Sequence, residues 1–402
     1  MSDATGQPLS GIRVLDLTQI YQGPYAAFLM AMAGAEVIKI EPPGGERMRG
    51  SGGSATPMAF AMLNSNKKSL VLDLKKPEGK LVLLRLVDKA DVLLENFAVG
   101  TMDRLGLGWE VLKKRNPKLI YASGTGYGLT GPDADLLAMD HTIQAAGGIM
   151  WATGDEGQPP VRAGGAPCDI MSGTHMYAGV LTALFTRNRS GGDEGVKGTR
   201  VEVSMLESMY FTLSSEYTAL NRTGEIPDRN SRRTPGGAYP YGTYQCKDGW
   251  LAMICVSEAQ WQRITQAIGK PEWGTDDCFS TARLRGVASE EIDAGIEQWA
   301  IGQTVAEAFA RMRAFKVPVS PAKSIEDVRT DPHMHERGML NWMQDEDLGE
   351  VVLPGSPIQY SEYERTRLKV FPRVGEHSRE VLSGWLGVSE SELDQLANDS
   401  VI

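Results

Sequence analysis

A single carboxylate in a segment of small residues is the group of this chain best suited to covalent chemistry. Asp169 stands in the run GAPCDIMSGT at residues 165–174, just ahead of a strongly apolar stretch at residues 176–187. Apolar residues of that stretch recur at spacings of three and four, which predicts a buried helix after the small-residue turn. Near the start of such a helix, the partial positive charge of unpaired backbone N–H groups favours an ionised carboxylate. Asp169 would then be ready to act as a nucleophile or a base.

Two other interpretations of this segment stay open. An aspartate before a helix is most often a cap, whose side chain accepts hydrogen bonds from backbone N–H groups and does no chemistry. Cys168 is a rival nucleophile, but most free cysteines are buried and only a lowered pKa makes them reactive. No Ser-His-Asp site can be assembled from the sequence, because no GxSxG elbow occurs. His333 and His335 are two residues apart, a spacing that does not favour a metal site, so none is expected.

The first half of the chain predicts the framework that would position Asp169. Helical runs at residues 25–33 and 77–89 alternate with β-like runs at 12–17, 36–40, 70–74, 92–95 and 119–123. This succession is typical of right-handed βαβ units, so we expect the α/β class, with a Rossmann-like open parallel sheet in a large domain. The first turn reads QIYQGP instead of GxGxxG, which argues against a dehydrogenase that binds a nicotinamide or flavin dinucleotide.

The length and the middle of the chain predict a second domain. A chain of 402 residues exceeds the size that one hydrophobic core usually supports. Composition turns polar after Asn221, and β-like runs at residues 243–246 and 250–256 flank Asp248-Gly249, which is typical of a hairpin. We expect a large domain at residues 1–221, a smaller α+β domain at 222–324 and a third segment at 325–402. Further helices are predicted at residues 258–268, 290–298 and 305–315, and in a tail at 380–396 that breaks near Gly384 or Gly387.

Composition limits the partners. The net charge is −10 and no block of five or six like charges occurs, which argues against general affinity for nucleic acid or anionic membranes. The four cysteines lack the spacing of a zinc site, and the N-terminus lacks the pattern of a signal peptide. No apolar run approaches the roughly 18 residues of a membrane span. We therefore expect a cytoplasmic protein.

Ordered blocks of sequence along almost the whole chain carry a family resemblance. They are residues 11–17 with Gly23-Pro24, 34–45 (GAEVIKIEPPGG), 64–69 (NSNKKS), 72–75 (LDLK), 91–100 (DVLLENFAVG), 103–106, 126–128, 144–148, Asp169 and 331–339 (DPHMHERGM). Together they resemble the class III coenzyme A transferases, the family of formyl-CoA transferase, carnitine CoA-transferase and α-methylacyl-CoA racemase. The resemblance implies an enzyme with acyl-CoA and free carboxylic acids as partners, CoA as co-substrate and no tightly bound cofactor.

The resemblance also implies a mechanism, because Asp169 stands at the position of the family's catalytic aspartate. As an acyl-CoA:carboxylate CoA-transferase, the chain would form an aspartyl-acyl anhydride and then an aspartyl-CoA thioester on that residue. Such a covalent relay conserves the energy of the thioester if water is kept out. Gly236 and Gly237 are similar in place to the family's glycine loop, whose backbone N–H groups would stabilise oxyanions. The other interpretation of these glycines is a plain connector between domains.

The binding of CoA is assigned by the same resemblance. Arg104 would lie near the CoA phosphates, and the residues 20–22 would face the thioester. Within these residues Tyr21 stands where formyl-CoA transferase has a glutamine. Elsewhere in the chain Met139 stands where that enzyme has a tyrosine, and both departures put a formyl or oxalyl substrate in doubt. The full set of residues expected at the cofactor is Ile20, Tyr21, Gln22, Leu72, Lys75, Asn96, Phe97 and Arg104.

Alternatives of function follow from the same family. The racemases place a histidine before an aspartate in a GHD motif, and here the aligned residues are Ala138-Met139-Asp140, with His141 two positions late. The transferase is therefore favoured over a racemase that would use Asp169 as a base, and over a non-catalytic CoA-binding protein. The resemblance further implies an interlocked homodimer in which the segment 325–402 is a linker and a return to the large, CoA-binding domain.

Overall fold

A computed structural model describes residues 6–50, 58–189, 197–227, 229 and 238–402 of the chain. These residues form two compact units. The first unit consists of Met1–Gly147, Gly164–Tyr210 and Asp331–Ile402, and the second of Gly148–Ala163 and Phe211–Thr330. The C-terminal segment therefore belongs to the same unit as the N-terminal one. The domain bounds expected from the sequence stay a prediction, and Gly236 and Gly237 lie outside the described residues.

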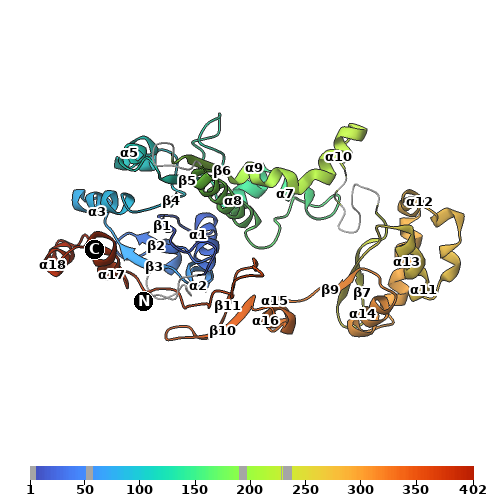
Figure 1. Ribbon diagram of the computed structural model, residues 1–402. Helices are drawn as coiled ribbons and strands as arrows, with labels where there is room; N and C mark the ends of the chain where they lie inside the picture. Colours follow the sequence, from blue (N-terminus) through green and yellow to red (C-terminus); the bar gives the residue numbers. More distant parts are fainter. Residues whose placement is uncertain (1–5, 51–57, 190–196, 228, 230–237) are drawn as a thin grey trace. The chain divides into compact units, whose positions relative to one another are not determined.

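A six-stranded sheet forms the centre of the first unit, and every neighbouring pair of its strands is parallel. The order is β3-β2-β1-β4-β5-β6, as Figure 1 shows. This arrangement confirms the expected α/β class and open parallel sheet. The strands are β1 (Arg13–Asp16), β2 (Glu36–Glu41), β3 (Lys68–Val71), β4 (Val92–Glu95), β5 (Ile120–Thr125) and β6 (Arg200–Ser204).

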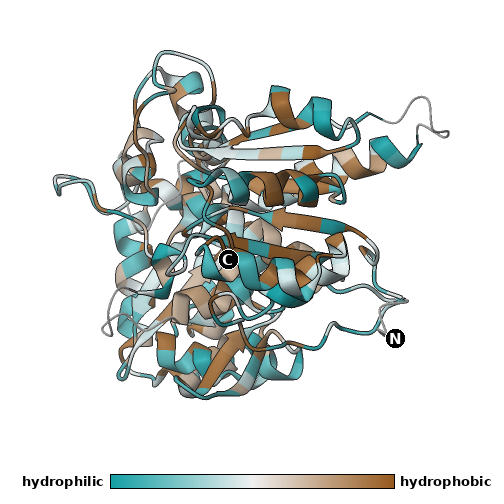
Figure 2. Cartoon of the chain, turned by 90° about the vertical axis from the view of Figure 1, so that its left-hand side faces the viewer, coloured by the Kyte–Doolittle hydropathy of each residue, from teal (hydrophilic) through white to brown (hydrophobic). Residues whose placement is uncertain are grey.

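Both faces of this sheet are buried, which explains the nearly continuous apolar runs of its strands. Alternate residues of a strand point to opposite faces, so Val14 joins one hydrophobic cluster and Leu15 the other. Figure 2 shows hydrophobic residues along the strands of the sheet. The first cluster includes α1 (Gln22–Met32) and α8 (Pro167–Arg189), and the second includes α3 (Pro77–Val87) and α17 (Ser378–Leu386).

Three details of the first unit differ from the expectations. The strand expected at residues 70–74 is β3 and begins two residues earlier, at Lys68. The tail helix is broken at Gly387, whose φ of +65° ends α17 before α18 (Glu390–Asn398) begins. An antiparallel hairpin that the sequence pattern did not reveal is formed by β10 (Leu340–Asp345) and β11 (Gly349–Pro354). The shorter helices of this unit are η1 (Arg47–Arg49), α2 (Met58–Asn64), α4 (Thr101–Leu105), α5 (Trp109–Arg115), α6 (Asp140–Ala146), α9 (Met205–Met209) and α16 (Pro332–Glu336).

The second unit contains the expected hairpin. Strands β7 (Tyr241–Gln245) and β8 (Trp250–Ile254) pair antiparallel, and β9 (Val319–Pro321) adds a third strand. Its core gathers apolar residues of the predicted helices, among them Trp261, Ile292 and Met312. The helices of this unit include α7 (Ile149–Ala152), α10 (Ser214–Thr223), α11 (Glu258–Ala267), α12 (Ala282–Val287), α13 (Ser289–Ala300), α14 (Val305–Ala314) and α15 (Ile325–Arg329).

The order of the strands predicts where a ligand binds. Strand β1 lies between β2 and β4, so the chain leaves β1 in one direction along the sheet and leaves β4 in the other. In open α/β sheets this reversal opens a crevice outside the carboxyl ends of the strands.

None of the helices in the described part of the chain combines the length and apolar character that a membrane-spanning helix needs.

Candidate active site

A cavity of about 670 Å³ opens at this position in the first unit. It is lined by Ile20 and Gln22 after β1, by Asn96 and Phe97 after β4, and by Asp169 of α8. Apolar side chains, including those of Val99, Leu136, Leu137, Met139 and Met205, form much of the remaining wall. The cavity therefore exposes the carboxylate of Asp169 to a space whose wall is mostly apolar.

Asp169 lies inside the first turn of α8, because the helix begins at Pro167 and not after residue 174 as the apolar spacing suggested. The carboxylate of Asp140, the first residue of α6, stabilises this earlier start. Its Oδ2 accepts the backbone N–H of Cys168 at 2.8 Å and that of Asp169 at 3.2 Å. Asp140 thus satisfies the unpaired donors of the helix start. Asp169 is not the cap, and its own carboxylate is left for other contacts.

The electrostatic expectation for Asp169 was wrong in direction. Only 8% of the residue is exposed, and burial raises the pKa of its carboxyl group to about 7, with a further rise from the negative charge of Asp140. A hydrogen bond from the backbone of Gln22 opposes this rise. The helix start does not lower the pKa because Asp140 already occupies its free N–H groups. Asp169 is therefore mainly protonated in acid and becomes an anion as the pH rises through about 7.

Cys168 is excluded as the nucleophile. Its side chain is fully buried, and burial together with the charges of Asp140 and Asp169 raises the pKa of its thiol to about 12. A thiol with such a pKa carries almost no thiolate at neutral pH.

Two glycines let the start of α1 approach Asp169. A Cβ on Gly173 of α8 would lie 2.4 Å from the backbone oxygen of Gln22. A Cβ on Gly124 of β5 would lie 2.5 Å from the side-chain Oε1 of the same Gln22. The backbone of Gln22 leaves no room for a side chain at position 173, and a side chain at position 124 would force that of Gln22 to move. Gln22 itself is 2% exposed, and its Nε2 is buried without a hydrogen-bond partner in the described part of the chain. A buried donor that lacks a partner beside a cavity is suited to a ligand oxygen.

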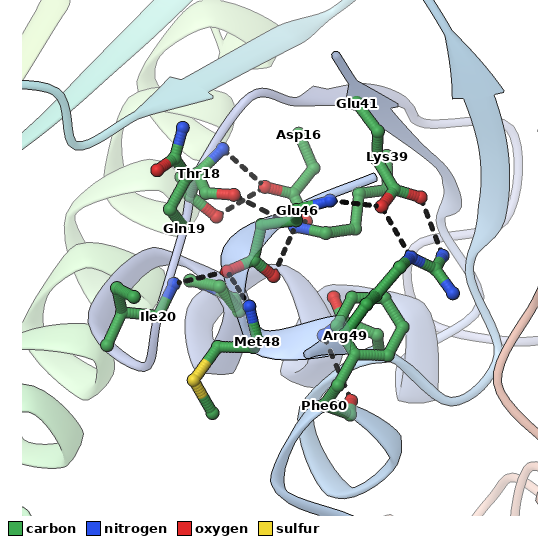
Figure 3. A network of polar contacts seen from close by, with 12 residues as sticks. Asp16, Thr18, Gln19, Ile20, Lys39, Glu41, Glu46, Met48, Arg49 and Phe60 are labelled. Atoms are coloured by element: carbon green, nitrogen blue, oxygen red, sulfur yellow. Dashed lines mark hydrogen bonds and ion pairs between the residues drawn. The ribbon is translucent and has the colours of Figure 1, made fainter. Parts of the chain in front are cut away.

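The turn before α1 is held in an unusual conformation. Ile20 has a φ of +67°, a left-handed value that is rare and strained for a β-branched residue. Its N–H donates to Glu46 Oε1 at 3.0 Å (Figure 3). On the other side, Gln19 and Asn96 exchange two hydrogen bonds of 2.7 and 2.8 Å between the backbone of Gln19 and the side chain of Asn96. The loops after β1 and β4 are therefore locked to each other.

Buried charges beneath this turn keep it in place. Lys39 Nζ donates to the backbone oxygen of Thr18 at 2.8 Å and lies 3.8 Å from Glu46 Oε2 (Figure 3). Lys67 Nζ lies 2.8 Å from Asp16 Oδ2, and all four of these ionic side chains are at most 2% exposed. Burial alone raises the pKa of Asp16, but the charges of Lys67 and Lys39 outweigh it and hold the pKa at about 2. The turn that faces Asp169 is thus fixed before any ligand binds.

Comparisons with known proteins agree with this site. The model of CoA-transferase family III matches residues 9–378. The chain belongs to CoA-transferase family III. It is 33% identical to the succinyl-CoA–L-malate CoA-transferase beta subunit of Chloroflexus aurantiacus, over 99% of each chain. It is 36% identical to the acetyl-CoA:oxalate CoA-transferase of Acetobacter aceti, over 89% of this chain and 90% of that one. The crystal structure of a CaiB/BaiF family protein from Brucella suis has a TM-score of 0.81 at 30% identity and covers 95% of this chain and 100% of its own.

The resemblance inferred from the sequence is thereby confirmed, and the chain is a CoA-transferase. Of its expected site residues, the structure gathers five around the cavity: Ile20, Gln22, Asn96, Phe97 and Asp169. Tyr21 is the half-buried N-cap of α1 and does not line it. Leu72 is 1% exposed in the second hydrophobic cluster, whereas Lys75 and Arg104 are exposed, with Arg104 donating to Thr101 Oγ1 at 2.7 Å.

Asp140 and Arg47 were not among the expected site residues of this CoA-transferase. Asp140 contacts the backbone of Asp169, and Arg47 lines the cavity. The sequence separation of 29 residues between the two aspartates hides their contact. The sequence did contain a signal for Asp140. A carboxylate is common at the first position of a helix, and α6 has only seven residues, so a carboxylate at position 140 is surplus to what so short a helix needs.

Replacement of Asp140 by asparagine tests its charge. Asp140→Asn keeps an oxygen that can accept the N–H groups of α8 but removes the negative charge, so the pKa of Asp169 falls. From the pKa of Asp169 we expect the acidic limb of kcat/KM near pH 7 in wild type, and in Asp140→Asn we expect it to move down by roughly one pH unit. Asp135→Asn is the matched control, since Asp135 lines the same cavity but is no cause of the raised pKa. An acidic limb that moves equally in both variants would contradict the assignment.

Proposed function

We propose that this CoA-transferase moves CoA from an acyl-CoA to a free carboxylic acid through covalent intermediates on Asp169. The observation that carries the proposal is the state of that carboxylate. It lies at a cavity, is shielded from bulk water, and has a pKa of about 7. A nucleophile tuned to this range is ionised at neutral pH and still basic enough to attack.

The first half of the reaction begins with attack of an Asp169 oxygen on the thioester carbonyl carbon. A C–O bond forms, the C–S bond breaks, and CoA leaves as a thiolate with the bonding electrons. The thiolate then attacks the Asp169 carboxyl carbon of the mixed anhydride. A new C–S bond forms, and the donor acid departs as a carboxylate, which leaves an aspartyl-CoA thioester.

The second half is the mirror image. The acceptor carboxylate attacks the aspartyl carbonyl carbon and releases CoA thiolate, which forms a new mixed anhydride. The thiolate attacks the acyl carbon of the acceptor, and the carboxylate of Asp169 is restored. No proton or water is consumed, so exclusion of water is the main requirement on the site.

Oxyanion stabilisation is proposed for groups around Asp169. Each addition places negative charge on a carbonyl oxygen, which needs donors that are already in place. The backbone of Gln22 hydrogen-bonds Asp169, and the unpaired Nε2 of Gln22 lies beside the same cavity. Gly236 and Gly237 keep their expected role as further donors.

CoA binding is proposed along the cavity. Asn96 and Phe97 line it, and Arg104 follows on α4. The expected contacts of Tyr21, Leu72 and Lys75 with CoA stay predictions.

A homodimer of interlocked subunits is also proposed from the family resemblance. The test is a measurement of the mass in solution by light scattering, which should be twice the mass of one chain.

A racemase is less well supported. Proton transfer on both faces of an α-carbon needs a second acid or base, and the racemases use a histidine. Among the described residues that line the cavity there is no histidine, and His141 is exposed on α6. Solvent deuterium that enters the α-carbon without exchange of CoA would favour the racemase.

Mass spectrometry of the intact protein tests the proposal. After incubation with acyl-CoA at pH 8, we expect a mass increase of one CoA minus water, located at Asp169 and removed by hydroxylamine. Asp169→Ala is expected to form none. The absence of an adduct from wild type with a panel of acetyl-, butyryl-, succinyl- and malyl-CoA would contradict the proposal.

A further inference from the structure

Among the described residues that line the cavity beside Asp169, Arg47 is the one that carries a positive charge. Three charged side chains of the described residues line it: Arg47, Asp135 and Asp169. With Asp140 also close to Asp169, carboxylates dominate the site. A free carboxylic acid is an anion at neutral pH and is repelled by such a site unless a cation compensates. Arg47 is the cation available among the described lining residues.

The residues on both sides of Arg47, Glu46 and Met48-Arg49, are anchored by hydrogen bonds. Glu46 Oε1 accepts the N–H of Met48 at 3.2 Å as well as that of Ile20 (Figure 3). Arg49 donates to both oxygens of Glu41 at 2.6 Å and lies 3.9 Å above the ring of Phe60. Arg47 is thus held between two anchored residues at the edge of the cavity.

The guanidinium of Arg47 itself is exposed. No carboxylate among the described residues forms an ion pair with it, although the two neighbouring charges are both paired. An arginine presents parallel N–H groups that match the two oxygens of a carboxylate. An unpaired guanidinium at a built cavity is therefore a ready receptor for an anionic group of a ligand.

Arg47 and Asp169 line the same cavity from different elements, η1 and α8. Arg47 makes no ion pair with Asp169, and the charges that shift the pKa of Asp169 include that of Asp140 but no cation. Because the two side chains line one cavity and form no ion pair with each other, Arg47 stays available to a second carboxylate while the first one reacts at Asp169. A substrate that reaches both sites needs two carboxylates on one short chain.

Resting on the function proposed above, we infer that Arg47 selects dicarboxylic acids. Its guanidinium binds the carboxylate that does not react, while the other carboxylate of the same acid exchanges CoA at Asp169. The relatives described above are named for malate and oxalate, which both carry two carboxylates. The competing role for Arg47 is a contact with a phosphate of CoA, and the experiment below separates the two.

The test compares discharge of the aspartyl-CoA adduct by two acids. Wild type and Arg47→Ala are loaded with acetyl-CoA, and the adduct is then discharged with succinate or with acetate. Acetate must discharge it, because that step is the reverse of loading. We expect the rate ratio of succinate to acetate to fall at least about 30-fold in Arg47→Ala, and about 10-fold in Arg47→Lys, which keeps the charge but not the parallel N–H groups. If wild type is loaded by succinyl-CoA but not by acetyl-CoA, the rate at which succinyl-CoA loads Arg47→Ala is expected to be lower than that of wild type by the same factor.

Arg104→Ala is the comparison variant, since Arg104 is expected at the CoA phosphates. It should raise the KM of every acyl-CoA alike and leave the ratio of the two acids within about twofold. An Arg47→Ala variant that behaves in this way would overturn the inference and assign Arg47 to a phosphate. A wild type that forms no adduct at all would instead contradict the proposed function, so the two failures are distinguishable.

Discussion

Asparagine in place of Asp169 is expected to lower kcat for CoA transfer by at least about 10⁴-fold. An amide cannot form the mixed anhydride, so the whole covalent route is lost, although the shape of the side chain and the hydrogen bond from the backbone of Gln22 are kept. Steady-state exchange between an acyl-CoA and labelled acid measures this loss. Cys168→Ala is the matched control from the neighbouring position and should retain activity within about tenfold, because the buried thiol takes no part. Comparable losses in both variants would indicate damage to α8 and not loss of a nucleophile.

Stability gives an independent test of the same substitution. The pKa of Asp169 is about 7 in the folded protein, above the value of 3.8 of an ordinary aspartate. The unfolded chain therefore releases this proton at lower pH than the folded one, and the carboxyl group destabilises the fold increasingly as pH rises between those values. Asp169→Asn removes the penalty, so its Tm should exceed that of wild type at pH 8, with a gap that narrows from pH 7 to pH 4. The gap corresponds to roughly 2–4 kcal/mol at pH 8. A pH-independent gap would contradict the raised pKa.

The sheet was predictable because its signals are local. Each strand of the first half carries a continuous apolar run, and each run is followed by helical spacing, so the parallel α/β class follows from periodicity alone. The hairpin β10–β11 was not predicted because burial in β10 does not follow residue type: polar Asn341 is partly covered, whereas the apolar Trp342 is 46% exposed. The start of α8 was not predicted correctly for a different reason. Asp140, which caps it, lies on another helix.

The site was predictable where a family block marks it and unpredictable where only three-dimensional contact does. Asp169, Asn96 and Phe97 lie in such blocks, and the structure gathers them at one cavity. The direction of the pKa shift of Asp169 depends on burial and on Asp140, neither of which a local pattern reveals. Leu72 shows where a family block is not enough. It lies in such a block, but the block does not reveal that the side chain of Leu72 packs in the core.

The buried charges beneath the turn at Ile20 explain why this part of the sequence carries unusual residues for a core. Lys39 and Lys67 are fully covered, which is rare for lysine, and each reaches backbone oxygens as well as carboxylates. Apolar replacements of similar volume would often be no less stable. The network instead supplies directed hydrogen bonds to Thr18 and Ile20, which hold a strained turn in one conformation. Its role is therefore to position the site, and its integrity can be tested through stability.

Methionine in place of Lys67 is expected to destabilise the protein by about 3–5 kcal/mol. Lys67 Nζ donates to Asp16 Oδ2 at 2.8 Å, to the backbone oxygen of Pro24 at 3.0 Å and to Asn64 Oδ1 at 2.9 Å. The substitution strands a buried carboxylate whose remaining cation, Lys39, is 4.0 Å away. It also releases the start of α1, which carries Gln22 to Asp169. Urea unfolding followed by tryptophan fluorescence and by far-UV circular dichroism measures the loss.

Lys68→Met is the matched control, because it makes the same chemical change one residue further along the chain. Lys68 is one-third exposed, and its partners Glu36 and Glu380 are exposed to a similar or greater extent. Such an ion pair contributes at most about 1 kcal/mol, so this variant should unfold close to wild type. In the double variant Asp16→Asn with Lys67→Met, no buried charge is stranded, and its destabilisation should be smaller than the sum of the single changes by at least about 2 kcal/mol. Additive effects would mean that the two side chains stabilise the fold independently, and the turn at Ile20 would then owe its conformation to packing instead of to the charges beneath it.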